Sequence, residues 1–266
     1  MRPLRRPPLG LWILAGTLAA GGAAARGQDA AAIIAKARAY LGSEAALDGV
    51  RSLHFTGTMQ EFFGTDPTPV NSTVEIIFQK PCQQCIVRKW ADKVETTGLD
   101  DLEAWLRTED AKNPAQWRLT LLAPDFVKRL RANTWENLNF YQGLEREGGT
   151  VSVLGSADVD GVKTVKVAFT HEPGIVFTRY FDAATGRLVL TETEQGGRVR
   201  QEGEIMAGGL RFHAREIYQT QGPDAKGQIV SKRMVITFDK ITLNEVFPDS
   251  RFAVPALLPP AAAPAP

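Results

Sequence analysis

The two cysteines are the first residues whose type and spacing could do chemistry. Cys82 and Cys85 stand three positions apart in Pro81-Cys82-Gln83-Gln84-Cys85, and the chain has no other cysteine. A short-loop disulfide, a redox-active thiol pair and part of a metal site are the three candidate chemistries. The disulfide is the leading prediction if the protein is exported, because exported proteins meet an oxidising environment. Redox catalysis needs a lowered thiol pKa, and residues 86–90 read as a strand rather than the helix start that would lower it.

Other catalytic or metal-binding constellations are not recognisable in the sequence. A metal site needs more ligands than the cysteine pair supplies, and His54, His171 and His213 lie far apart in strand-like segments. Neither Gly-x-Ser-x-Gly nor His-Glu-x-x-His occurs. The glycine pairs read as hairpin turns rather than phosphate loops. We therefore predict no enzyme, cofactor or metal, and interpret the acidic groups as solvated edges and turns: Asp100-Asp101-Glu103 and Glu192/Glu194.

A basic and aromatic segment in the middle of the chain could contact lipid. Lys128-Arg129 and Arg131 fall on the polar side of an amphipathic stretch that carries Phe126 and Leu130. This pattern fits a solvated helix face, and it also fits a transient contact with a membrane surface. Aromatic residues gather around the same stretch, where they can be core or can line the mouth of a pocket for acyl chains: Trp105, Trp117, Phe126, Trp135, Phe140 and Tyr141.

The N-terminus has the layout of a secretory signal peptide over residues 1–27. Arginines at the start precede an apolar run from Leu9 to Ala25, and small residues close it. Cleavage after Gly27 fits best, with cleavage after Ala25 as the alternative. A membrane anchor is the competing interpretation, although the run is shorter than the ~20 residues that a spanning helix needs. No cysteine lies near the cleavage site, so we predict an exported, periplasmic protein that is not lipidated.

The composition is that of an ordinary globular protein. The chain is 44% hydrophobic and 23% charged, and its net charge of +1 gives no general attraction to nucleic acid. No interior linker or repeat marks a second domain, so we predict a single domain over residues 28–255. Residues 256–266 consist mainly of alanine and proline, and we predict a disordered tail there.

Two helical segments are expected to position these residues. Apolar residues recur at helix spacing over residues 29–47, with Asp29 as the predicted cap. Gly42 either loosens this helix or ends it before a short turn over residues 44–47. A second helical stretch begins at Pro124 and runs to about Gln142, and we expect Asn133-Thr134 to divide it.

The rest of the domain reads as strands. Leu53, Phe55 and Met59 alternate with polar residues, which is typical of a strand with one buried face. We predict ten strands: residues 53–60, 74–78, 86–96, 151–153, 162–170, 175–181, 188–191, 198–206, 210–219 and 229–241. Short glycine turns between them indicate consecutive antiparallel pairing. The predicted class is α+β, with a strongly curved half-barrel sheet covered by the N-terminal helix and the mid-chain helical insert. Its hollow is either fully packed or open for an apolar ligand.

Four segments in this order resemble a known family: Gly98–Trp105, Tyr180–Val189, Thr237–Asn244 and Phe247–Pro255. Together with the order of helix, strands and helical insert, they resemble the LolA/LolB-like periplasmic lipoprotein-carrier superfamily, which includes outer-membrane lipoprotein-sorting-like proteins. The resemblance implies a half-barrel that binds acyl chains beneath a helical lid, without catalysis. The pair Cys82 and Cys85 is not part of that pattern, and no binding position is carried over residue by residue.

Three functional hypotheses follow. The first is an exported carrier or binding protein for an apolar ligand, which would be a lipid or an acylated lipoprotein. The second is a non-catalytic envelope protein with a filled interior that contacts another protein. The third is a thiol-disulfide protein that uses the two cysteines. For the first hypothesis, the predicted ligand-binding residues are Leu53, Phe55, Met59, Ile76, Phe78, Trp90, Trp105, Phe126, Leu130, Trp135 and Leu138.

Overall fold

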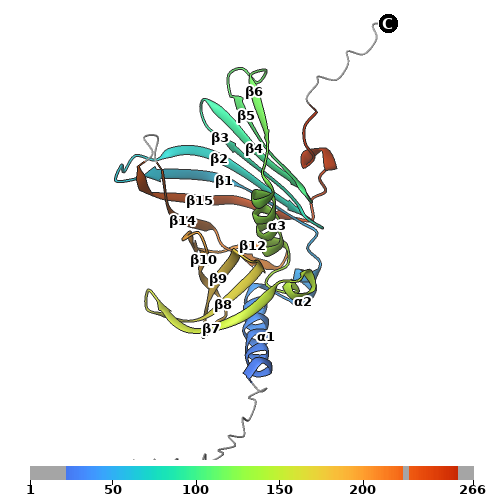
Figure 1. Ribbon diagram of the computed structural model, residues 1–266, viewed down its shortest axis with the longest axis vertical. Helices are drawn as coiled ribbons and strands as arrows, with labels where there is room; N and C mark the ends of the chain where they lie inside the picture. Colours follow the sequence, from blue (N-terminus) through green and yellow to red (C-terminus); the bar gives the residue numbers. More distant parts are fainter. Residues whose placement is uncertain (1–21, 224–227, 257–266) are drawn as a thin grey trace, which may run out of the picture.

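The computed structural model describes residues 22–223 and 228–256, which form an α+β domain (Figure 1). Its helices are α1 (Gly22–Leu41), α2 (Glu44–Asp48) and α3 (Pro124–Leu138), with short 3-10 turns at Leu144–Glu147 and Asp249–Arg251. The main sheet is antiparallel, curved and not closed into a barrel. It contains 13 strands in the order β6-β5-β4-β3-β2-β1-β15-β14-β11-β10-β9-β8-β7, and β12 and β13 form a separate hairpin.

The structure has more strands than the ten predicted, as the strand bounds show. The first strands are β1 (Ser52–Phe63), β2 (Val70–Gln79), β3 (Gln83–Lys89), β4 (Lys93–Asp100), β5 (Glu103–Asp110) and β6 (Trp117–Leu121). The next are β7 (Thr150–Val159), β8 (Val162–Glu172), β9 (Ile175–Asp182) and β10 (Leu188–Thr193). The last are β11 (Arg198–Glu202), β12 (Ile205–Ala207), β13 (Leu210–Phe212), β14 (Arg215–Pro223) and β15 (Ile229–Leu243).

The first helix begins earlier than predicted. It starts at Gly22, so position 29 lies inside α1 and not at its start. Gly42 follows the end of the helix, and a Cβ there would stand 3.0 Å from the carbonyl oxygen of Gly209, so this close approach requires glycine. Ser43 then caps α2 by accepting a hydrogen bond from the N–H of Ala46. The predicted signal peptide and tail fall mainly on residues outside the described ranges, and both remain predictions.

The single strand predicted over residues 86–96 is wrong, because that segment forms the hairpin β3–β4. Trp90 lies in the turn, where its N–H donates to the carbonyl oxygen of Lys93. The turn reverses the chain, and Val94 consequently packs on the opposite face of the sheet from Ile86. Strands β5 and β6 were not predicted either, since charged residues interrupt their apolar alternation.

The strands predicted over residues 198–206 and 210–219 are each divided in two. Gly203 adopts a φ of 64°, which ends β11, and β11 then pairs directly with β14. The intervening residues leave the main sheet as the hairpin β12–β13. Leu210 and Phe212 of this hairpin are buried in the core, so the interruption supplies packing for the hollow of the sheet.

The two faces of the sheet carry separate apolar clusters. The face covered by the helices, here called the inner face, contains the main cluster around Leu53, Phe55 and Phe238. The opposite face carries a smaller cluster formed by Ile77, Cys85, Val87 and Phe252, and the C-terminal segment covers it. Among the described residues, no helix is long and apolar enough to cross a membrane.

Candidate functional site

Helix α3 bridges the curve of the sheet. Near its N-terminus, Val127 packs with Leu99 and Ala104 of β4 and β5. Further along the helix, Glu136 contacts β8 and β9 through His171 and Arg179. Strand β4 is the third in the sheet order and β8 is the twelfth. One helix therefore reaches both arms of the sheet, because the sheet curves around it (Figure 1).

Polar contacts attach α3 to the sheet on both sides. Lys128 pairs with Glu172 at 2.7 Å, Arg129 pairs with Glu194, and Arg131 pairs with Asp101. The basic cluster that the sequence offered for a membrane surface is thus engaged within the molecule. These pairs are partly exposed, and such pairs contribute little to stability because solvent screens them.

Residues Asn133 and Thr134 do not divide α3, contrary to expectation. Both lie inside one continuous helix. The amide of Asn133 and the hydroxyl of Thr134 donate to the side-chain oxygen of Gln84 at 3.1 and 3.4 Å. Gln84 is fully buried on β3, so the polar residues in the helix find a partner in the sheet. The helix therefore continues through these two polar residues, which donate hydrogen bonds to the Gln84 side chain.

Glu136 is the most buried charged group on α3. Its side chain is 2% exposed and lies 2.6 Å from His171 Nε2 and 2.5 Å from a terminal nitrogen of Arg179. The guanidinium of Arg179 also stacks on the ring of Tyr141, 4.6 Å from its centroid. A buried charge needs such partners, since an unpaired one is costly. Burial also raises the pKa of Tyr141, which keeps its hydroxyl protonated.

The chain leaves α3 through a strained turn. Phe140 and Tyr141 have φ values of 47° and 73°, which bulky residues rarely adopt. Arg38 of α1 holds this turn by donating to the carbonyl oxygens of Asn139 and Phe140 at 3.3 and 3.1 Å. Strained backbone of this kind persists only where its surroundings fix it, and it is often found at binding sites.

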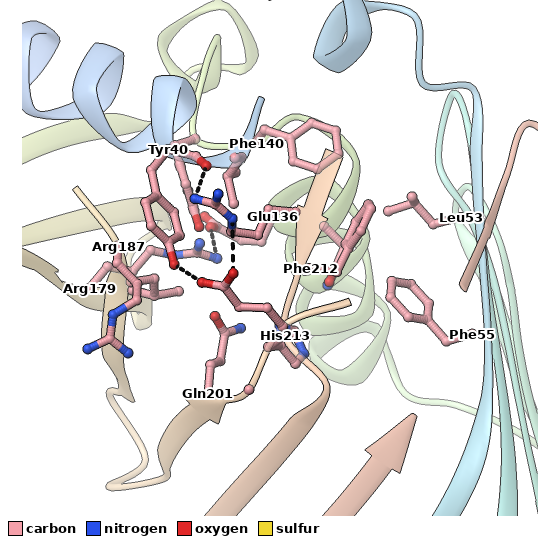
Figure 2. Close-up of a pocket in the computed structure, with 17 residues that line it drawn as sticks. Tyr40, Leu53, Phe55, Glu136, Phe140, Arg179, Arg187, Gln201, Phe212 and His213 are labelled. Atoms are coloured by element: carbon pink, nitrogen blue, oxygen red, sulfur yellow. Dashed lines mark hydrogen bonds and ion pairs between the residues drawn. The ribbon is translucent and has the colours of Figure 1, made fainter. Parts of the chain in front are cut away.

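A cavity of about 110 Å³ opens beside this turn (Figure 2). Figure 2 shows its two sides: Leu53, Phe55 and Phe212 lie on one side, with Tyr40, Arg179 and Arg187 on the other. Near the charged side, the Tyr40 hydroxyl donates to Glu204 at 2.5 Å, and Arg211 lies 3.2 Å from the same carboxylate. The remaining lining residues are Leu41, Glu136, Asn137, Phe140, Tyr141, Leu188, Gln201, Gly203 and His213.

Most of the predicted ligand-binding residues lie on the inner face. Seven are in the main cluster or pack against it: Leu53, Phe55, Met59, Ile76, Phe78, Trp90 and Leu138. Leu130 packs with the cluster between α3 and strands β4 and β5. Trp135 packs with the cluster beneath α1. Of the eleven, only Leu53 and Phe55 line the cavity.

Two of the predicted residues lie away from the inner face. Trp105 lies on the opposite face, where its Nε1 donates to the carbonyl oxygen of Phe252 at 2.7 Å. The β4–β5 hairpin, which the sequence did not reveal, sets that orientation. Phe126 is 61% exposed at the start of α3 and belongs to none of the buried clusters. Neither residue faces the inner core.

The predicted disulfide is not formed, because both cysteines are free thiols. Cys82 packs beneath α3, whereas Cys85 is buried in the cluster on the opposite face. Burial raises the pKa of each thiol to about 11. Thiol–disulfide catalysis requires the reverse shift. The described residues also contain no group of three or more His, Cys, Asp or Glu side chains that could hold a metal ion.

The charged side of the cavity was missed by sequence reasoning. One signal was available at Arg179, which alternates with Phe177 and Phe181 in β9 and therefore occupies an inward position. Glu136 likewise falls between the apolar positions of α3. The contributions of Tyr40 and Arg211 depend on the β12–β13 hairpin and were not foreseeable from local pattern.

Comparisons with known proteins establish the fold. No protein-family model matches the sequence, and no curated protein is similar to it at a significant level. A LolA superfamily protein from Nitrosomonas europaea superposes with a TM-score of 0.54 at 11% identity, covering 85% of this chain and 97% of that one. A DUF1329 family protein from Desulfovibrio piger gives 0.53 at 9% identity, covering 84% and 97%.

A third solved structure agrees with these two. An outer membrane lipoprotein-sorting protein domain from Vibrio parahaemolyticus superposes with a TM-score of 0.52 at 10% identity, covering 84% of this chain and 97% of that one. At such identities the likeness concerns the path of the backbone and carries no activity across. On this evidence, the chain has the LolA-like fold that its sequence segments resemble.

Proposed function

We propose that this protein is an exported carrier or binding protein for an apolar ligand, the acyl chain of a lipid or of an acylated lipoprotein. The ligand would lie on the inner face between the curved sheet and α3. The observation that carries the proposal is the construction of α3, which spans an apolar core but is attached to the sheet largely by polar contacts. The names of the structural neighbours, a LolA superfamily protein and a lipoprotein-sorting domain, support the same class of function.

In this proposal the cavity is too small for the ligand, so the structure is the closed state of the protein. Pockets for small-molecule ligands start at about 300 Å³, and the cavity beside α3 holds about 110 Å³. An acyl chain therefore has to displace α3 or the side chains beneath it. Burial of each methylene contributes about 0.8 kcal/mol, so a chain of ordinary length can offset the loss of several partly exposed ion pairs.

The test is native mass spectrometry of the protein purified without detergent, followed by titration with a fluorescent fatty acid. The proposal expects co-purified lipid, or saturable binding of the probe that unlabelled fatty acid reverses. Absence of both would overturn it.

A second candidate function has its own support. This candidate is an envelope protein that has a filled interior and contacts another protein, and the small cavity favours it. Such a protein would bind no acyl probe. The same titration separates the two candidates. If the probe does not bind while the protein pulls a defined envelope partner from solution, the second candidate replaces the first.

A further inference from the structure

The cavity beside α3 has more positive than negative groups in its lining. Three guanidinium groups, from Arg179, Arg187 and Arg211, face two carboxylates, from Glu136 and Glu204. Arg179 is paired with Glu136 and Arg211 with Glu204. Arg187 forms no ion pair with any described residue. Among the lining residues, the arginines therefore outnumber the carboxylates by one.

Two carboxylates outside the lining, those of Asp182 and Glu216, interact with its charged groups. His213 lies 3.0 Å from Glu216. Burial acts to raise the pKa of Glu216, but the charge and hydrogen bond of His213 outweigh it and lower the pKa. Burial also acts to raise the pKa of Asp182, but hydrogen bonds from Ala184 and Thr185 and the charge of Arg187 outweigh it and lower the pKa. Tyr40 stays neutral, because burial and its hydrogen bond to Glu204 raise its pKa.

The deepest guanidinium also has an unused donor. Arg179 is 8% exposed as a residue, and its ε nitrogen has no hydrogen-bond partner in the structure. Buried donors are rarely left in this state. Guanidinium groups bind phosphate and carboxylate oxygens through paired N–H donors, which gives both strength and geometry.

The opposite side of the cavity is apolar, which indicates that an anion bound by the arginines would carry an apolar group. Leu53, Phe55 and Phe212 belong both to this lining and to the main apolar cluster. Figure 2 shows these three side chains facing the charged set across the cavity. A ligand with a compact anion and an apolar extension matches this arrangement, because the cavity itself is too small for the extension.

We propose that this cavity binds the singly charged phosphate diester group, with Arg187 as its main contact and Arg179 and Arg211 beside it. A diester carries a single negative charge and two terminal oxygens that can accept hydrogen bonds from guanidinium N–H groups, including the unpartnered ε nitrogen of Arg179. The group can belong to a phospholipid head group or to a free phosphate diester. The lipid source rests on the function proposed above, whereas the anion site does not.

The test uses three probes and isothermal titration calorimetry at low salt. Dimethyl phosphate presents the diester alone, dihexanoylphosphatidylglycerol below its micelle concentration presents diester and chains, and dihexanoylglycerol presents chains alone. The variants are Arg187→Gln and Arg187→Lys. Arg118→Gln, an exposed arginine on β6 outside the cavity, is the matched control.

The proposal expects dihexanoylphosphatidylglycerol to bind the protein about tenfold or more tightly than dihexanoylglycerol, since a charged hydrogen bond contributes about 1.5–3 kcal/mol. Arg187→Gln should abolish that difference, Arg187→Lys should keep part of it, and Arg118→Gln should keep all of it. Equal binding of the two lipids together with no Arg187-dependent binding of dimethyl phosphate, or an unchanged difference in Arg187→Gln, would overturn the site.

The outcomes also separate this site from the proposed function. If dimethyl phosphate binds in an Arg187-dependent manner while neither lipid binds better, the anion site stands and the acyl-binding function fails. If dihexanoylglycerol binds but dimethyl phosphate does not and the lipids bind equally, the function stands and the anion site fails. Circular dichroism of each variant confirms that the comparison is between folded proteins.

Discussion

The Glu136 carboxylate on α3 lies 2.5 Å from a terminal nitrogen of Arg179 on β9, and both side chains are at most 10% exposed. This pair joins the helix across the apolar core to the far arm of the sheet. His171 contacts the same carboxylate from β8. The helix that covers the inner face is therefore held at this point by charge rather than by apolar packing alone.

Removing the charge of Glu136 should weaken the attachment of α3. Glu136→Gln leaves Arg179 and His171 without their shared carboxylate, and breaking a buried ion pair on one side costs about 3–5 kcal/mol. Urea unfolding should show that loss, and hydrogen exchange should show faster opening of α3. The control is Glu145→Gln, an exposed residue in a 3-10 turn, which should change stability by less than about 0.5 kcal/mol. Equal stabilities of the two variants would refute the role given to Glu136.

Acid should loosen the other end of α3. Partial burial acts to raise the pKa of Glu194, but hydrogen bonds from Arg129 and from the N–H of Val176 outweigh it and hold the pKa below the ordinary value of 4.5. A lowered folded-state pKa contributes stability that is present above the unfolded pKa and is lost as pH falls through the folded one. Glu194→Gln should thus lower the melting temperature at pH 7, with the difference from the native chain shrinking below about pH 4.5. A pH-independent difference would contradict this assignment.

The C-terminal segment should contribute to stability through Phe252. Its ring is fully buried with Ile77 and Cys85, and its carbonyl oxygen accepts from Trp105. Phe252→Ala should cost about 3–5 kcal/mol in urea unfolding, because it leaves a cavity in this cluster. Val246→Ala is the nearby control, since Val246 is 89% exposed and its truncation should cost almost nothing. Similar costs for the two would show that the segment does not pack as described.

Both cysteines should react slowly while the protein is folded. With each pKa raised to about 11 by burial, only about one thiol in a thousand is ionised at pH 8, and the thiolate is the reactive form. Alkylation by iodoacetamide, followed by mass spectrometry, should therefore speed up about tenfold per pH unit between pH 7 and 10. Urea should make both thiols react at the rate of ordinary cysteine. Recovery of a Cys82–Cys85 disulfide from the purified protein would contradict the free thiols of the structure.

The sequence predicted the parts of this fold that depend on local pattern. The alternation of Leu53, Phe55 and Met59 placed all three on the inner face, and the family resemblance gave the correct fold. The orientation of Trp105 was not predictable, because it depends on a hairpin whose strands carry charged residues at apolar positions. A hairpin turn reverses the chain and so decides which face each side chain occupies.

The local sequence pattern did not predict the charged part of the site, for a different reason. Arg179, Arg187 and Arg211 come from separate strands or turns, and only the curvature of the sheet and the β12–β13 hairpin bring them to one cavity. The spacing of these residues along the chain does not predict that they lie close together in space. The inward position of Arg179 between two phenylalanines was the only local indication of it.

The most direct test of acyl binding beneath α3 is the rate at which a fluorescent fatty acid enters the protein, measured by stopped-flow mixing. We predict slow, saturating entry into the native chain, since α3 has to open first, and entry at least about tenfold faster into Glu136→Gln, whose helix is less firmly held. Glu145→Gln should behave like the native chain. Entry at the same rate into all three proteins, or no entry into any of them, would contradict a ligand site covered by this helix.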